Sequence, residues 1–218
     1  KDKIIGTTKK GNGPAYRSKY ERSGIQAKNA LEFKPFLIDL YEEFHNKKDV
    51  KILCEGAQGF ELDIDWGDYP YVTSSHCVAA SALLNGIPPQ AVRNIWGVGK
   101  VYDTYVGQKQ FEPDDDIFPM LREIGEEYGA TTSRPRQCNW LNLDSLNRSL
   151  AINGATHLVL NKIDVLEQID RWNVYHLGET LKFSSKEKMC DYIVDNTPFK
   201  NKRENVFFSG NKHNLNPN

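Results

Sequence analysis

A short polar segment after a predicted strand carries the clearest chemistry of this sequence. Residues 156–160 form a β-branched, apolar run typical of a buried strand, and the tetrapeptide NKID follows at 161–164. A carboxylate held edge-on to guanine accepts hydrogen bonds from N1–H and from the exocyclic amine, whereas adenine presents an acceptor at N1. Facing an acceptor would cost about 1–3 kcal/mol, so Asp164 is predicted to select guanine. The stem of Lys162 can lie against the base, although four residues alone also fit a surface turn.

The phosphate-binding pattern G-x-x-x-x-G-K-[ST] is absent from the sequence. The sequence can therefore recognise a guanine but offers no P-loop for its triphosphate. This disfavours a regulatory GTPase.

Hydroxyl and guanidinium groups gather in several other loops. Residues 131–136 hold three hydroxyls and two arginines, which match carboxylate and phosphate oxygens, and Pro135 restrains the backbone between them. Residues 6–8, 11–14 and 69–75 add further glycines and hydroxyls. Each loop alone fits an exposed polar turn. Their recurrence favours a site for several phosphate- and carboxylate-bearing ligands.

The composition is that of an ordinary globular protein, with 218 residues, 39% of them hydrophobic, and a formal net charge of −1. This charge argues against a nucleic-acid partner, although eight basic and two acidic residues in positions 1–30 form a basic arm able to attract phosphates. No apolar run approaches the roughly 20 residues of a membrane span, and we expect no signal peptide. Cys54, Cys77, Cys138 and Cys190 form no C-x-x-C pair, which indicates free thiols in a reducing, cytoplasmic compartment.

Hydrophobic periodicity predicts alternating helices and strands. The predicted helices cover residues 31–47, 74–84, 117–124, 144–152 and 184–194, with a short one after Pro88. The predicted strands cover residues 50–54, 95–101, 156–160 and 206–208. The acidic triplet 114–116 is interpreted as a helix cap rather than a metal site. We therefore expect a single, partial α/β domain over 1–218, with a loop-like nucleotide-binding arm at 1–29 and an α/β body at 30–218.

The motifs, in their order, resemble the adenylosuccinate synthetase family. They read GTT…GPAY-x-x-K-x-x-R, then GAQG…LDID-x-G-x-YPYVTSS, then ATT-x-R-x-R, then NGAT…K-x-D-VL. The resemblance covers residues 4–168 and fades after Glu167. It implies a P-loop-NTPase-like fold with a mixed, mostly parallel sheet and flanking helices, of which this chain would be the C-terminal part.

The resemblance also implies a reaction in AMP and purine biosynthesis. GTP with Mg²⁺ phosphorylates IMP at O6, and the amino group of aspartate displaces the phosphate to give adenylosuccinate. The positions matching IMP contacts are Thr8, Arg22, Gln58, Thr73 and Arg134. Those matching the aspartate loop are Ala130, Thr131, Thr132, Ser133, Arg134 and Arg136. Those matching GTP contacts are Arg136, Lys162, Asp164, Ser209 and Gly210.

Two further positions carry implied roles. Lys19 stands at the family's signature lysine and is the one catalytic candidate in this sequence. Arg22 resembles the arginine that reaches IMP in the neighbouring subunit, which implies a homodimer.

The sequence also departs from the family pattern. It lacks the family's N-terminal portion with the phosphate loop, the principal acid–base groups and the Mg²⁺ contacts, so we expect no metal ligand here and no activity from this chain alone. Ser133 and Pro135 stand where the family usually has Gly and Arg. Two alternatives stay open: a phage-type synthetase acting on dGMP, and a non-catalytic nucleotide-binding protein.

Overall fold

The computed structural model describes residues 5–130, 133–210 and 215–217, the side chains of the last three excepted. Contacts within the chain divide it into two compact units. We call Lys1–Thr7 with Asn94–Asn218 the sheet unit, and Thr8–Arg93 the loop unit. The expected division into an arm at 1–29 and a body at 30–218 stays a prediction.

A parallel sheet forms the centre of the sheet unit. Strands β1 (Trp96–Lys100), β4 (His157–Asn161) and β7 (Val206–Ser209) run parallel in that spatial order. Strand β8 (Leu215–Pro217) pairs antiparallel with β7 and follows it in the sheet. These three parallel strands confirm the predictions for residues 95–101, 156–160 and 206–208.

A second sheet of four strands was not predicted. Strand β2 (Tyr102–Tyr105) pairs antiparallel with β3 (Gln137–Asn142). Strand β3 runs parallel to β5 (Trp172–His176), which in turn pairs antiparallel with β6 (Glu179–Phe183). This second sheet is separate from the first and is mixed, since it combines antiparallel pairs with one parallel pair.

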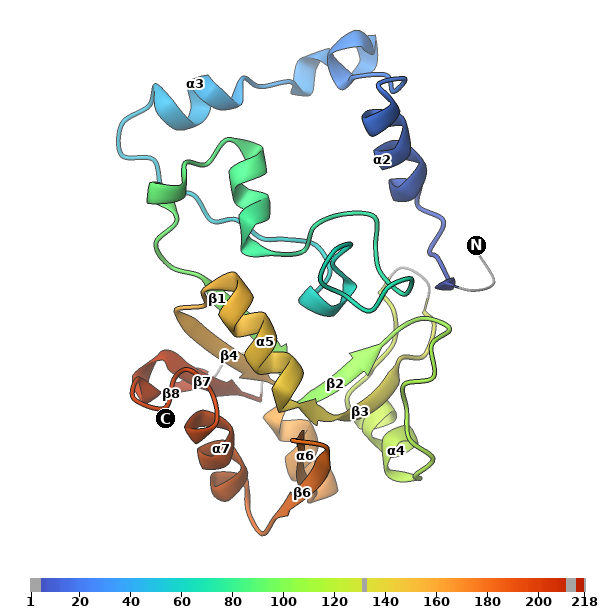
Figure 1. Cartoon of the computed structure of the whole chain (residues 1–218), viewed down its shortest axis with the longest axis vertical. Coiled ribbons are helices and arrows are strands. Elements are labelled where there is room, and N and C mark those ends of the chain that lie inside the picture. Colours follow the sequence, from blue (N-terminus) through green and yellow to red (C-terminus); the bar gives the residue numbers. More distant parts are fainter. Residues whose placement is uncertain (1–4, 131–132, 211–214, 218) are drawn as a thin grey trace. The chain divides into compact units, whose positions relative to one another are not determined.

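Helices flank these strands (Figure 1), namely α4 (Ile117–Ile124), α5 (Leu143–Asn153), α6 (Ile163–Ile169) and α7 (Lys186–Asp195). Helix α4 packs against β3 and α6, α5 against β3 and β5, α6 against β7, and α7 against β5 and β6. The predicted fold class, an α/β protein with a parallel sheet and flanking helices, is confirmed. A 3-10 turn at Arg203–Asn205 leads into β7.

Side chains in the local sequence fix where these helices begin. The Asn142 side chain accepts a hydrogen bond from Ser145 N at 3.0 Å and caps α5. Ser185 caps α7 in the same way. The Asp115 carboxylate accepts from Ile117 N at 3.0 Å, whereas Asp116, the N-cap residue of α4, makes no side-chain capping bond. The capping interpretation of residues 114–116 is therefore confirmed for Asp115 alone.

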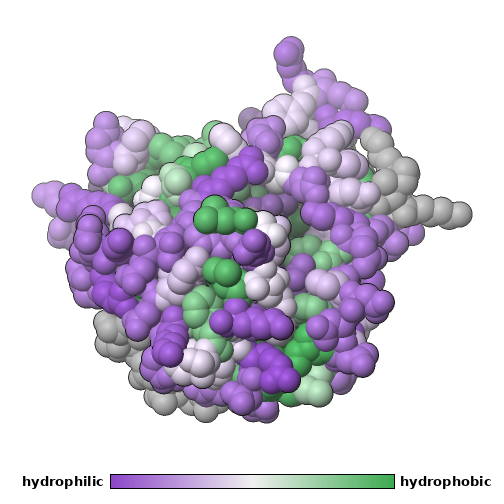
Figure 2. Space-filling view, turned by 60° about the horizontal axis from the view of Figure 1, so that its bottom comes forward, coloured by the Kyte–Doolittle hydropathy of each residue, from purple (hydrophilic) through white to green (hydrophobic). Residues whose placement is uncertain are grey.

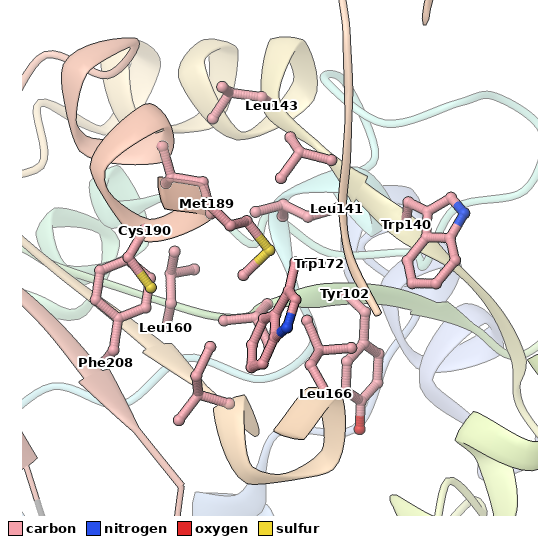
Figure 3. Close-up of a cluster of buried hydrophobic side chains, with 14 of the residues drawn as sticks. Tyr102, Trp140, Leu141, Leu143, Leu160, Leu166, Trp172, Met189, Cys190 and Phe208 are labelled. Atoms are coloured by element: carbon pink, nitrogen blue, oxygen red, sulfur yellow. The ribbon is translucent and has the colours of Figure 1, made fainter. Parts of the chain in front are cut away.

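The core lies between the helices and the two sheets. Leu160, Leu166 and Met189 are fully buried and meet in the cluster drawn in Figure 3. Burying one such side chain contributes about 1.5–3 kcal/mol. The four cysteines are free, as predicted, and burial raises the pKa of Cys138 and of Cys190 to about 12. Both thiols therefore stay protonated at neutral pH.

The loop unit differs more from the sequence-based expectation. Residues 1–29, expected to be a loop, contain helix α2 (Asn12–Glu21). None of its side chains is buried, so it has no apolar stripe from which periodicity could reveal a helix.

The single helix predicted at 31–47 is wrong. The segment forms a 3-10 helix at Leu31–Phe36 and a short helix α3 (Leu40–His45). Pro35 lies inside the first of these, and Asp39 caps the second through its carboxylate. A proline and a new cap therefore interrupt the apolar spacing that suggested one continuous helix.

The strand predicted at 50–54 is also wrong, because these residues join no sheet in the described chain and are exposed throughout. An apolar run becomes a strand only when a neighbour supplies hydrogen bonds and a packing surface. The helix predicted at 74–84 is a 3-10 helix at Ala79–Asn85, and the short helix after Pro88 is a 3-10 turn. The remaining 3-10 turns of this unit are Ala27–Asn29 and Phe60–Leu62.

On the face drawn in Figure 2, hydrophobic residues gather in separate patches between hydrophilic ones. None of the described helices combines the length and apolar composition that crossing a bilayer requires.

Candidate functional site

The carboxyl ends of two neighbouring parallel strands hold the candidate site. Lys100 ends β1 and lies in register with Asn161, the last residue of β4. Lys162 follows with a left-handed φ of 68° and is the N-cap residue of α6, whose first turn contains Asp164. In open α/β sheets, ligands bind at this edge, where loops leave the strands.

Asp164 presents a buried acceptor. Its Oδ1 is shielded from solvent and has no hydrogen-bond partner in the described part of the chain. A buried, unpaired acceptor costs about 1–3 kcal/mol unless a ligand supplies a donor. Gly210 lies against this carboxyl group, since a Cβ built on Gly210 would come within 2.9 Å of the Asp164 Cβ. The structure thus brings the predicted GTP residues Asp164, Ser209 and Gly210 together, with Ser209 at the end of β7.

Lys162 is held by the main chain at the end of α4. Its Nζ donates a hydrogen bond to the Gly125 carbonyl at 2.9 Å. Gly125 must be glycine, because an added Cβ would lie 2.5 Å from the Tyr102 hydroxyl. Backbone packing therefore fixes the position of the Lys162 ammonium.

Glu127 lies at the centre of the charge network beside these residues and is only 2% exposed. Its Oε2 accepts hydrogen bonds from Lys100 Nζ at 2.7 Å and from Arg136 Nη1 at 2.8 Å. Its Oε1 accepts from the Tyr102 hydroxyl at 2.7 Å. Burial alone would raise the pKa of Glu127, but these bonds and the two cations offset it, so the pKa lies below its ordinary value. Glu127 is ionised at neutral pH.

Burial also shifts the pKa values of its partners. Burial is the largest influence on Lys100, and the charges of Arg136 and Lys162 add to it, so its pKa is lowered even though Glu127 opposes the shift. For Tyr102, burial and the bond to Glu127 both raise the pKa, which keeps the hydroxyl a neutral donor. Three cations stand here against the carboxylates of Glu127 and Asp164, which leaves an excess of positive charge suited to an anionic ligand.

The loop from Glu127 to Arg136 is closed at its base. Arg136 N donates to the Glu127 carbonyl at 2.9 Å, while the side chains of the same two residues form the ion pair. Within the loop, Gly129 N donates to the Arg134 carbonyl at 2.8 Å, and Ser133 N to the Gly129 carbonyl at 2.7 Å. Ser133 takes a left-handed φ of 51°.

The two arginines of this loop point to different partners. Arg134 Nη1 donates to the Gly6 carbonyl at 2.9 Å, so Arg134 contacts the Gly-Thr motif of the same unit. Ala130 is exposed, and Thr131 and Thr132 lie outside the described residues. The aspartate-binding role of this loop stays a prediction.

A second ion pair supports the exit of the loop. Arg122 pairs with Glu112, and its Nε donates to the Arg136 carbonyl at 2.5 Å. The Glu112 carboxylate also accepts from Cys138 N at 2.7 Å. These bonds hold Arg136 at the point where the chain enters β3.

The other predicted IMP residues and Lys19 lie in the loop unit. Thr8, Arg22 and Gln58 are exposed, the latter two with left-handed φ values of 60° and 62°. Thr73 N donates to the Leu62 carbonyl at 2.8 Å. Lys19 is exposed in the last turn of α2, and its Nζ lies 5.9 Å from the centre of the Tyr16 ring. The roles of these residues stay predictions.

One group in the described residues has metal-ligating side chains close together: Asp63, Asp65 and His76. The carboxylate of Asp63, however, accepts backbone hydrogen bonds from Asp65, Trp66 and Cys77 at 2.9, 3.1 and 2.5 Å. Mg²⁺ prefers an octahedron of oxygen ligands. A triad containing a histidine and a carboxylate already bonded to three backbone N–H groups does not fit it.

Three residues of the site were not predicted from the sequence: Lys100, Tyr102 and Glu127. Lys100 had a usable signal, since it lies in the predicted strand 95–101, near its carboxyl end. Glu127 is one of several acidic residues in a polar stretch, and nothing local distinguishes it. Its importance comes from contacts with residues distant in the sequence.

A mixed α/β unit with cations and an unpaired carboxylate at the carboxyl ends of parallel strands has the character of a nucleotide-binding protein. The family model for adenylosuccinate synthetase matches residues 30–195, and the chain belongs to the adenylosuccinate synthetase family.

Named relatives agree with this assignment. The chain is 40% identical to adenylosuccinate synthetase of Helicobacter pylori strain HPAG1 over 87% of this chain and 59% of that protein. It is 36% identical to the enzyme of the same name from Lodderomyces elongisporus, over 85% of this chain and 54% of the relative. The chain thus spans little more than half the length of these relatives.

Two solved structures are similar. Fully ligated adenylosuccinate synthetase from Plasmodium falciparum matches with a TM-score of 0.72 and 30% identity, over 85% of this chain and 56% of that one. Succinoaminodeoxyadenylate synthetase of cyanophage S-2L, bound to dGMP and to dATP as an energy donor, matches with a TM-score of 0.66. At 19% identity, over 94% of this chain and 59% of the cyanophage chain, the second match shows a shared fold alone.

Proposed function

We propose that the whole protein is a carbon–nitrogen ligase that joins aspartate to a 6-oxopurine nucleotide with GTP as the energy donor. With IMP as the acceptor, the products are adenylosuccinate, GDP and phosphate. Membership of the adenylosuccinate synthetase family supports this reaction. We further propose a cytoplasmic homodimer in which Arg22 contacts IMP bound to the other subunit.

The observation that carries guanine recognition is the unpaired Oδ1 of Asp164. It lies in the first turn of α6, at the carboxyl edge of the parallel sheet, with Gly210 against it. The N1–H and exocyclic amine of guanine are the donors that such a carboxylate lacks. Lys162 and Ser209 complete the proposed base site.

The remaining residues bind and orient anionic groups. Arg136 and Lys162 are proposed to face the nucleotide, and the loop around Arg134 to face aspartate and IMP. Mg²⁺, when bound, neutralises charge developing on the transferred phosphoryl group. We expect its ligands and the principal acid–base groups in the part of the relatives that this chain does not span, so this chain alone should bind nucleotide without turning it over.

Changing Asp164 to Asn tests this proposal through the choice of nucleotide. The asparagine side chain can still accept a hydrogen bond from N1–H of the base. Its NH₂ group, however, would face the exocyclic amine of guanine, so two donors would meet. Xanthine has a carbonyl at that position, which can accept from the NH₂ group. We therefore expect Asp164→Asn to weaken GTP binding and strengthen XTP binding, each by about tenfold. Calorimetric titration of the chain measures both, and aspartate-dependent turnover with either nucleotide repeats the test in the whole protein.

Asp195→Asn is the matched control, because Asp195 pairs with Arg203 at the surface, on α7. This variant should keep the nucleotide preference of the wild type. If Asp164→Asn also keeps it, Asp164 does not recognise the base. A whole protein that consumes no GTP with aspartate and either IMP or dGMP contradicts the ligase itself.

A further inference from the structure

We infer that Glu127 is a positioning residue, which aims Arg136 and Lys100 at the anionic groups of the nucleotide whose base lies at Asp164. The identity of that nucleotide rests on the function proposed above. The positioning role rests on the contacts of Glu127 itself.

Glu127 fixes Arg136 at two points. Its carbonyl accepts from Arg136 N and its Oε2 accepts from Arg136 Nη1, so main chain and guanidinium are held by the same residue. Within the described part of the chain, only Nη1 of the Arg136 side chain donates a hydrogen bond, and Nε and Nη2 do not. The N–H groups of Nε and Nη2 can therefore donate to a ligand, while the bond from Nη1 fixes the plane of the guanidinium.

The same carboxylate ties this loop to both sheets. Lys100, at the end of β1, bonds Oε2, and Tyr102, at the start of β2, bonds Oε1. Lys100 Nζ also donates to Thr104 Oγ1 at 3.0 Å. Glu127 therefore holds two cations from separate parts of the fold at one place, with side chains that are at most about a third exposed.

The balance of charge argues against simple neutralisation. One Glu127 carboxylate faces two directly bonded cations, and Lys162 is close enough to lower the pKa of Lys100. Asp164 is a second carboxylate close enough to influence this network, through Tyr102. The surplus positive charge is what an anionic ligand would neutralise.

The two roles open to Glu127 predict opposite results. If it served only as a countercharge, its removal would leave the site more positive and strengthen anion binding. If it positions Arg136 and Lys100, its removal frees both side chains and weakens anion binding. Glu127→Gln keeps the shape and removes the charge, so the direction of the change decides between them.

The experiment measures binding of GTP, guanosine and inorganic tripolyphosphate to the 218-residue chain. We expect Glu127→Gln to weaken binding of GTP and of tripolyphosphate by about tenfold, and to leave guanosine binding unchanged. Unchanged guanosine binding also shows that the variant is folded. Asp195→Asn, a carboxylate-to-amide change at the surface, should affect none of the three.

A pH profile adds a signature that a merely structural role would not give. Glu127 opposes the lowering of the Lys100 pKa by burial, Arg136 and Lys162. Without Glu127, Lys100 should lose its proton more readily. As pH rises above neutral, binding of tripolyphosphate to Glu127→Gln should then weaken at lower pH than binding to the wild type does.

A double-mutant cycle tests whether Glu127 acts through Arg136. Arg136→Ala should weaken tripolyphosphate binding, and adding Glu127→Gln to it should weaken binding much less than Glu127→Gln does alone. Additive losses, or tighter anion binding by Glu127→Gln, would overturn the inference.

The failures of the two proposals are distinguishable. If the wild type binds tripolyphosphate but has no preference for guanine, the proposed function fails and the Glu127 comparison still stands. If the wild type does not bind tripolyphosphate, Glu127 positions no anion site and the inference is wrong.

Discussion

The sheet unit and the loop unit differ in how far their apolar side chains are buried. Apart from Ile87, every buried apolar side chain of the described residues belongs to the sheet unit. Most of the exposed large apolar side chains fall in the loop unit, with Leu53 at 94% and Ile25 at 87% exposure as the extremes. A region with few buried contacts opens at low free energy, whereas a packed core opens only with the whole unit.

Among the described residues, each unit has one buried acidic side chain, Glu127 in the sheet unit and Asp63 in the loop unit, and the two show the same contrast. Glu127 bonds side chains from two strands and a loop, so it joins distant parts of the sheet unit. Asp63 bonds the backbone of its own turn and of Cys77, so it orders a local segment. Lys162 and Asp164 in the sheet unit therefore stand on a packed support. In the loop unit, Thr8, Arg22 and Gln58 are exposed.

The largest expected effect comes from a cavity in the packed unit. Leu160 on β4 is fully buried, so Leu160→Ala should reduce the free energy of unfolding by about 3 kcal/mol. The same change at the exposed Leu53 should stay within about 0.5 kcal/mol. Denaturant titration followed by circular dichroism measures both. Equal losses would show that the loop unit is packed as firmly as the sheet unit.

A smaller effect should separate the two acidic residues. Burial would raise the pKa of Asp63, but its three backbone hydrogen bonds and His76 offset this, so the pKa is lowered. Asp63 therefore stabilises its turn above its unfolded pKa of about 3.9, and this stabilisation is lost as pH falls through the lower folded value. In Asp63→Asn, an NH₂ group would face a backbone N–H. The change should therefore lower the free energy of unfolding of this turn by about 1–2 kcal/mol at neutral pH.

Amide hydrogen exchange of residues 62–77 at several pH values measures this effect. The wild type should lose protection in acid, and Asp63→Asn should show little further loss. The exposed Asp65→Asn serves as the control and should behave as the wild type does. If Asp63→Asn still lost amide protection in acid as the wild type does, a group other than Asp63 would cause the acid response.

The parts of the fold that sequence predicts are those with local signals. Capped helices such as α5, and the apolar strand β4 followed by NKID, were located from caps and periodicity. Helix α2 was not, because none of its residues is buried and its sequence has no apolar face. The second sheet was largely missed because its strands depend on partners far away in the chain.

The candidate site divides in the same way. Asp164 and Lys162 follow a strand directly, and their chemistry can be predicted from a tetrapeptide. The network of Glu127 joins positions 100, 127 and 136, and only the fold brings them together. The separation of two residues in the sequence does not show how close they lie in space. Residues in polar loops that orient a site therefore cannot be identified from the sequence alone.

The smallest expected effect concerns backbone strain in one residue of each unit. Ser133 in the sheet unit and Gln58 in the loop unit both adopt left-handed conformations, with φ of 51° and 62°. Glycine relieves a strain of about 1–2 kcal/mol at such a position. It also gives the unfolded chain more conformational entropy, which offsets about 0.5–1 kcal/mol of this gain. Ser133→Gly should therefore stabilise the sheet unit by about 0.5 kcal/mol, because the bonds at the base of its loop prevent relaxation. Gln58→Gly should instead lower stability by about 0.5 kcal/mol, because a loosely packed turn has little strain to relieve and only the cost in the unfolded chain remains. Thermal unfolding of the two variants beside the wild type compares them, and a larger gain at Gln58 would place the greater constraint in the loop unit.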